Sequence, residues 1–90
     1  MSGTVKLRVR VFTMAATNAN FRSDYALARA MGLNRSTVTR VVAGVLQPGP
    51  AFIAGALTVL APLRFEDLFE VVLDNPTEAE LDRLRVQAGG

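Results

Sequence analysis

The segment SDYALARAMGLNRSTVTRVVAG, residues 23–44, decides the fold that this sequence predicts. Its first half places Leu27, Ala28 and Met31 at positions i, i+1 and i+4, which form one apolar stripe if the segment is helical. Gly32 follows directly, and glycine is the residue best suited to the left-handed turn that ends a helix. The spacing therefore predicts a helix that ends at this glycine.

A second helix is predicted over residues 34–43. Asn34 is a favoured N-cap residue, and Gly44 suits the left-handed position that follows a helix. Apolar side chains recur at helical spacing on one face. They are Val38, Val41 and Val42. The opposite face carries small, hydroxyl-bearing and arginine side chains: Arg35, Ser36, Thr39, Arg40 and Ala43.

Two short helices joined by a tight, glycine-containing turn form a helix-turn-helix. The DNA major groove is wide enough to hold a helix, arginine pairs with guanine there, and serine or threonine hydrogen-bonds to several bases. We therefore predict that helix 34–43 enters the major groove of double-stranded DNA. The side chains predicted to read bases are Arg35, Ser36, Thr39 and Arg40.

The segment resembles the helix-turn-helix of the phage repressor/Cro family, also called the xenobiotic-response-element family. The resemblance covers roughly residues 22–70 and is weaker at the end, where LRFEDLF looks like that family's closing helix. The residues that carry it are Leu27, Ala28, Gly32, Asn34, Arg35, Ser36, Thr37, Val38, Arg40, Gly44 and Pro48. It implies a homodimer that binds two DNA half-sites as a repressor-like regulator of transcription.

The same resemblance implies phosphate contacts at helix ends and in loops. The matching residues are Arg22, Ser23, Tyr25, Thr37 and Gln47. Asp24 departs from the family, which often has glutamine at this position. A carboxylate there repels phosphate unless it accepts a hydrogen bond from a cytosine amino group. Val45 and Leu46 also depart, because the family often has a polar residue after the second helix.

Charge divides the chain into a basic front and an acidic back. Residues 1–64 hold eight Lys or Arg and one Asp, a net charge of +7, and residues 65–90 hold two Arg and seven Asp or Glu, a net charge of −5, which together give +2. This arrangement suits a protein that turns one side towards phosphate.

The residue types of common catalytic and metal sites are missing. The chain has no cysteine and no histidine, so it lacks thiolate and imidazole ligands and the commonest general base. It has no glycine-rich phosphate cradle and no cofactor motif. We therefore predict no enzyme activity, no cofactor and no metal site, and we interpret the carboxylates as a solvated acidic face.

Residues 41–63 carry no charge, but glycine and prolines interrupt this run. The unbroken part, Ala51–Leu63, is shorter than the roughly 20 residues that a membrane-spanning helix needs. The start of the chain lacks the apolar core of a signal peptide. We expect a cytoplasmic protein of a bacterial or phage-infected cell, without membrane contact and associated with the nucleoid when bound to DNA.

The N-terminal segment alternates apolar and charged residues, which predicts a strand over residues 4–11 and then a short helix over residues 12–19. A helical stripe is the rival interpretation, since Leu7, Val11 and Met14 also fit one.

A strand needs a partner for its ladder groups, and residues 70–73, EVVL, are rich in β-branched side chains. Pairing these two segments would bring opposite charges together, which is mildly favourable. The charges are those of Lys6, Arg8 and Arg10 near Glu70 and Asp74. Pairing of strand 4–11 with its copy in a second subunit is the alternative, but it would oppose like charges.

Pro50 is placed as the first residue of a helix over residues 50–61 that Pro62 ends. Its apolar side chains lie on most sides, and such a helix is usually buried on most sides. A 90-residue chain has little else to cover it, so we expect some of this surface to contact a subunit.

A short helix over residues 64–69 is predicted next. Thr77 and Glu80 then form a capping box that opens a last helix, residues 77–87. The predicted fold is mainly α, a compact helix-turn-helix domain of about five helices with a small two-stranded antiparallel sheet. Residues 1–74 form the predicted domain and residues 75–90 a C-terminal helical extension.

A protein–protein module built on a helix-turn-helix is the alternative function. It would be an antitoxin or a phage-encoded protein that binds a host factor. The features that favour it are the apolar helix and its surroundings, residues 50–63, and the acidic C-terminal third.

Deletion of residues 1–10 is expected to destabilise the domain, because strand 4–11 then no longer pairs with residues 70–73. The melting temperature of the deletion variant measures this loss. A melting temperature equal to that of the full chain would contradict the pairing.

Overall fold

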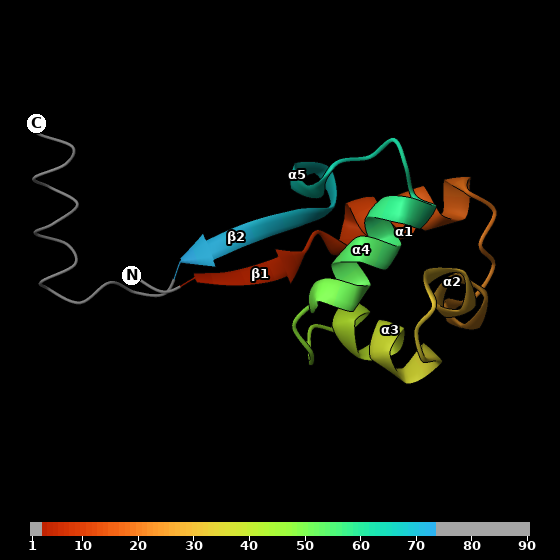
Figure 1. Cartoon of the computed structure of the whole chain (residues 1–90), viewed down its shortest axis with the longest axis horizontal. Helices are drawn as coiled ribbons and strands as arrows, with labels where there is room; N and C mark the ends of the chain where they lie inside the picture. Colours follow the sequence, from red (N-terminus) through yellow and green to blue (C-terminus); the bar gives the residue numbers. More distant parts are fainter. Residues whose placement is uncertain (1–2, 74–90) are drawn as a thin grey trace, which may run out of the picture.

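The computed structural model describes residues 3–73, which form a compact, mainly helical domain of five helices and one two-stranded antiparallel sheet (Figure 1). In chain order the elements are β1 (Gly3–Leu7), α1 (Val9–Asn18), α2 (Asp24–Met31), α3 (Arg35–Val42), α4 (Pro50–Val59), α5 (Phe65–Leu68) and β2 (Phe69–Leu73). This is the predicted fold class. The predicted extension 75–90, with its helix 77–87, lies outside the described residues.

Every element contributes an apolar side chain to one core. Phe52 of α4 contacts Phe12 of α1 and Phe69 of β2, with ring centres 5.5 and 6.3 Å apart. All three rings are buried, and burial of one such ring stabilises a fold by about 1.5–3 kcal/mol. Phe65 of α5 stacks on Phe69 with ring centres 5.1 Å apart. The aromatic cluster therefore joins α1 and α4 to the consecutive elements α5 and β2.

Strands β1 and β2 join the two ends of the described chain into a ribbon that extends away from the helices (Figure 1). Leu7 lies opposite Phe69, and both are buried where the ribbon meets the core. Lys6 lies opposite Glu70, as the charge pattern predicts. The predicted pairing within the chain is therefore confirmed.

The predicted strand 4–11 is too long, because β1 ends at Leu7 and helix α1 replaces its second half. The ladder ends where Leu7 pairs with Phe69, the first residue of β2. The stripe of Leu7, Val11 and Met14 is not the face that α1 buries, since Val11 and Met14 are 39% and 65% exposed. The buried side chains of α1 are Phe12 and Ala16, four residues apart. Arg10 consequently lies on α1 and not in the ladder.

Arg8 forms the corner between β1 and α1. Its backbone N–H donates to the Leu68 carbonyl at 2.8 Å, and its Nε donates to the Phe69 and Glu66 carbonyls at 3.2 and 3.3 Å. Its guanidinium also lies 3.7 Å from the Glu70 carboxylate. An ion pair this exposed contributes at most about 1 kcal/mol. The bonds to carbonyls therefore do more to fix the corner.

Helix α4 begins at Pro50 as predicted but ends at Val59, before the predicted residue 61. Pro62 lacks an N–H and disfavours helical backbone at Ala61, which shortens the helix. The exposed positions of α4 carry small side chains. They are Pro50, Ala51, Ala54 and Thr58. Its larger apolar side chains are buried or half-buried by the rest of the domain. Contact of the remaining α4 surface with a subunit stays a prediction.

The last two described elements differ slightly from the prediction. Helix α5 is a single turn inside the predicted range 64–69, and β2 begins at Phe69 because that ring turns into the core. Within residues 3–73, no helix has both the length and the apolar run needed to cross a membrane.

Gly55 allows α4 to approach the last turn of α2 closely. A Cβ atom at this position would lie 2.9 Å from the carbonyl oxygen of Met31 and 3.0 Å from its Cβ. Real Cβ atoms do not approach a backbone oxygen this closely. The helix-turn-helix is therefore seated on α4 at a point where a side chain does not fit.

Gly55→Ala is expected to destabilise the domain by about 1–3 kcal/mol, because the methyl group must push α4 away from Met31. This cost exceeds the roughly 1 kcal/mol by which alanine favours a helix over glycine. Thermal unfolding should show a melting temperature lower by several degrees, at about 4–8 °C per kcal/mol.

Gly49→Ser is the control, since nothing lies within 4 Å of its Cβ position, its φ is −90°, and serine is a favoured residue at this N-cap position. Its melting temperature should not fall below that of the unmodified chain. If Gly55→Ala melted at the same or a higher temperature than the unmodified chain, the tight contact with Met31 would be contradicted.

Candidate nucleic-acid interface

Helix α2 begins with a side-chain cap. The Ser23 hydroxyl oxygen accepts a hydrogen bond from the Ala26 N–H at 3.1 Å. The Ser23 backbone is extended, with φ −153° and ψ 159°, as is usual for an N-cap residue. The predicted cap is confirmed, and it leaves the start of α2 open to solvent at Asp24.

The turn between α2 and α3 is closed by two backbone hydrogen bonds. Gly32 has φ +74°, the left-handed conformation that its position in the sequence predicts. The Gly32 N–H donates to the Arg29 carbonyl at 3.2 Å, and the Leu33 N–H donates to the Ala28 carbonyl at 2.8 Å. These bonds satisfy carbonyls at the end of α2 and fix the direction in which α3 leaves.

Helix α3 buries its apolar face. Val38 and Val41 are 0% and 2% exposed. Asn34 stands at the predicted N-cap position, but its side chain makes no capping hydrogen bond, so that part of the prediction is wrong. Gly44 adopts φ +79° just after the helix, as predicted, and the Val45 N–H donates to the Arg40 carbonyl at 3.0 Å. Both ends of α3 are thus held by the backbone.

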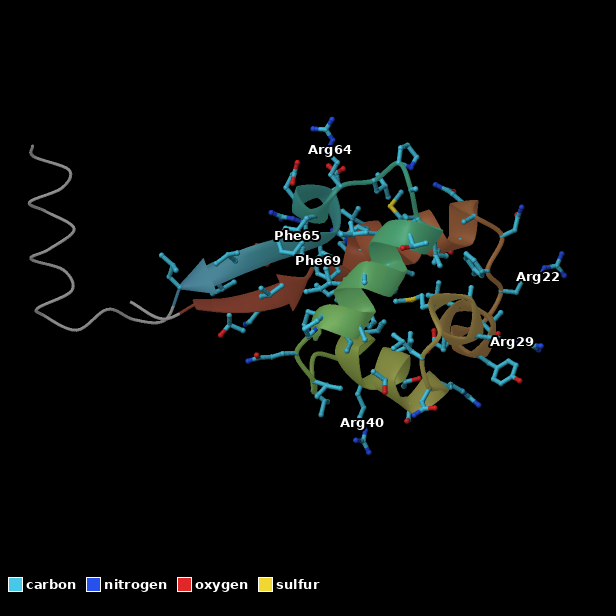
Figure 2. All side chains as sticks on the ribbon, in the orientation of Figure 1. Arg22, Arg29, Arg40, Arg64, Phe65 and Phe69 are labelled. Carbon is cyan, nitrogen blue, oxygen red and sulfur yellow. The ribbon has the colours of Figure 1, made fainter. Side chains whose placement is uncertain are left out.

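The four predicted base-reading side chains lie together on the exposed side of α3, here called the outer face. They are Arg35, Ser36, Thr39 and Arg40. Their spacing of i, i+1, i+4 and i+5 places them on one side of a helix. Arg40 points away from the body of the protein (Figure 2). The outer face is therefore convex, polar and accessible, with a rigid apolar back.

The structure divides the predicted phosphate-binding residues among four places. Arg22 and Ser23 line a depression of about 230 Å³ that α1, α2 and the end of α3 surround. Tyr25 lines a second one, of about 290 Å³, at the turn of the helix-turn-helix. Gln47 lines a groove of about 400 Å³ against β1, away from the start of α2. Thr37 is half-buried on α3.

The structure shows three features of this surface that the sequence-based prediction of the site did not include. Arg29 lines the same depression as Tyr25 and Arg35. Its position four residues after Tyr25 places both side chains on one side of α2, and this spacing could have identified Arg29 from the sequence. Lys6 lines the groove of Gln47, which only the fold of the ribbon reveals. The Thr39 hydroxyl donates to the Asp24 carboxylate at 3.3 Å and so links the outer face to the start of α2.

Most of the described acidic side chains lie away from the helix-turn-helix. All of them except Asp24 lie on α5 and β2, namely Glu66, Asp67 and Glu70. Arg22, Arg29 and Arg40 surround the helix-turn-helix, whereas Arg64 lies at the opposite end of the domain (Figure 2). Lys6 lies on β1, and Arg8 forms an ion pair with Glu70. Only part of the predicted basic front therefore lies on the side that carries the outer face.

The described residues show no sign of a catalytic centre. None of the side chains buried within residues 3–73 is polar or charged, and no group of three or more acidic residues among them could hold a metal ion. The depressions near α2 and α3 are shallow and lined by mixed side chains.

Comparison with known proteins adds no family. No family model matches the chain, and no match is found among curated proteins or solved structures. Interpretation of the outer face therefore depends on its geometry and charge.

Proposed function

We propose that this protein binds double-stranded DNA in a sequence-specific manner and regulates transcription as a repressor does. Helix α3 enters the major groove with its outer face towards the bases. The observation that supports this most strongly is the two-sidedness of α3. Val38 and Val41 are buried in the core, and the opposite side presents two arginines and two hydroxyls to solvent.

The outer face matches the hydrogen-bonding groups of the major groove. Arg35 and Arg40 each carry a planar guanidinium that can donate two hydrogen bonds to guanine O6 and N7, which discriminates against other bases by about 1–3 kcal/mol. Ser36 is exposed beside Arg35 and can donate to or accept from a base. These side chains stand on a helix whose back is packed in the core, so binding would order the side chains but would not have to order the backbone.

Phosphate contacts would come from the rim of the outer face. The start of α2 presents unpaired N–H groups, which favour an anion, and Arg22 adjoins it in the sequence. Arg29 lies at the turn, in the depression that it shares with Tyr25. Contacts of this kind position a protein on DNA without reading sequence.

A solvated polar helix face is the ordinary explanation for these residues. The local charge argues against it. The described acidic side chains other than Asp24 lie on α5 and β2, whereas Arg22, Arg29, Arg35 and Arg40 lie on α3 or around the helix-turn-helix. The outer face and its rim are therefore net positive, as a surface that meets phosphate requires.

A second copy of the chain would complete the binding unit on a two-fold symmetric operator. The free end of the ribbon exposes Val71 and Leu73 to 60% and 55%. Antiparallel pairing of β2 with its own copy, centred on Val71, would set Glu70 opposite Val72 and bring no like charges together. The ribbon therefore replaces α4 as the surface that we assign to the homodimer.

A protein–protein module is the second candidate function, and the same ribbon favours it. Exposed apolar side chains also occur beside the ribbon, at Val45 and Leu46, which are 79% and 43% exposed. Contiguous exposed apolar surface marks interaction sites in soluble proteins. This candidate predicts tight binding of a protein partner and indifference to DNA.

Selection of random duplex DNA by the purified chain at two salt concentrations tests the proposal. We expect enrichment of a two-fold symmetric motif with half-sites about one helical turn apart. Retention should fall steeply as salt rises, because bound cations are released from phosphate. No enrichment at either salt concentration would contradict the proposal and favour the protein–protein module.

Arg35→Ala and Arg40→Ala are each expected to weaken binding to the selected motif by about 1–3 kcal/mol and to remove the preference for guanine at one position. Binding to random duplex should fall much less. The outer face is solvent-exposed, so the melting temperature should change little. Fluorescence anisotropy with selected and scrambled duplexes measures both affinities.

Arg64→Ala is the matched control, because it removes the same charge at the opposite end of the domain (Figure 2). It should leave discrimination between the selected and scrambled duplexes unchanged. Wild-type discrimination by both Arg35→Ala and Arg40→Ala would exclude α3 as the recognition helix.

A further inference from the structure

Asp24 conflicts with the charge of the surface around it. It is the one acidic residue of the first 64 in the sequence, and it occupies the first position of α2, next to the outer face. Its Oδ2 atom accepts a hydrogen bond from the Thr39 hydroxyl at 3.3 Å. A carboxylate so placed repels DNA phosphates unless it gains a hydrogen-bond donor from the DNA itself.

The hydrogen bond between Asp24 and Thr39 determines what this pair can recognise. An ionised carboxylate only accepts hydrogen bonds, and a hydroxyl has one hydrogen to donate. Since Thr39 donates that hydrogen to Asp24, its oxygen can only accept from a third group. Both side chains are exposed. The pair therefore presents acceptors to solvent and would select a donor.

Major-groove donors are the amino groups of cytosine and adenine. Adenine also presents the acceptor N7 beside its amino group, and this lone pair repels a carboxylate. Cytosine presents its N4 amino group with no acceptor of its own alongside. Of the two bases, cytosine thus fits an acceptor pair better.

We propose that Asp24, oriented by Thr39, is a specificity-determining residue that accepts a hydrogen bond from a cytosine amino group in the DNA site. This inference rests on the proposed DNA-binding function and adds one base to it. Arg35 and Arg40 share the outer face with Thr39, so the cytosine belongs to the same half-site as the guanines that they read. Their positive charge offsets the repulsion between Asp24 and phosphate.

Asp24 is the first residue of α2, but it does not cap the helix. Ser23 already caps the helix through its own hydroxyl. The second oxygen of the Asp24 carboxylate therefore has no capping role and can meet a base.

Parallel selections of random duplex DNA by the full chain and by its Asp24→Asn variant test this inference. Asparagine has the size of aspartate but presents an acceptor and a donor, the pattern that pairs with adenine N6 and N7. We expect a cytosine in the half-site selected by the unmodified chain. In the variant, the preference for that cytosine should fall about tenfold in favour of adenine, with the other positions unchanged.

Glu66→Gln is the control, because it neutralises the same charge on α5, away from the outer face. Selection with this variant should enrich the same DNA motif as selection with the unmodified chain. If Asp24→Asn also returned that motif, or weakened every position equally, the carboxylate would not read a base and this inference alone would be overturned. If the unmodified chain enriched no motif, both this inference and the proposed function would be overturned. Melting temperatures equal to that of the unmodified chain would establish that both variants fold.

Discussion

Packing around helix α4 is the constraint on which the rest of the domain depends. Phe52 contacts Phe12 on one side and Phe69 on the other, so α4 joins the first helix to the last strand. One turn further along the same helix, Gly55 lets the last turn of α2 approach at Met31. The ribbon and the helix-turn-helix are therefore attached to the same helix, and displacement of α4 would disturb both.

This scaffold determines what α3 can present. Since Val38 and Val41 are buried in the core, rotation of α3 about its axis would expose them at a cost of about 1.5–3 kcal/mol each. The left-handed turns at Gly32 and Gly44 fix the two ends of the helix. The outer face consequently needs no rearrangement before it meets a ligand, which lowers the entropy lost on binding.

Local signals in the sequence were sufficient to predict the helix-turn-helix and to place its four candidate base-reading residues on one exposed face. The helical spacing and the turn at Gly32 each involve only a few neighbouring residues. The start of α1 at Val9 was not predictable in this way. The alternation of apolar and charged residues continues past Leu7, whereas the ladder ends there because Phe69, its partner, is the first residue of β2. The contact of Gly55 and the bond from Thr39 to Asp24, 15 residues apart, arise from packing between helices. No local sequence pattern predicts such contacts.

Mapping of amide chemical shifts of the isotope-labelled protein, during titration with duplex DNA at low salt, tests most directly that α3 enters the groove. The account predicts the largest changes over residues 35–40 and 22–26, with small changes over residues 65–73. Changes confined to the ribbon, or no changes at all, would contradict DNA recognition by the outer face of α3.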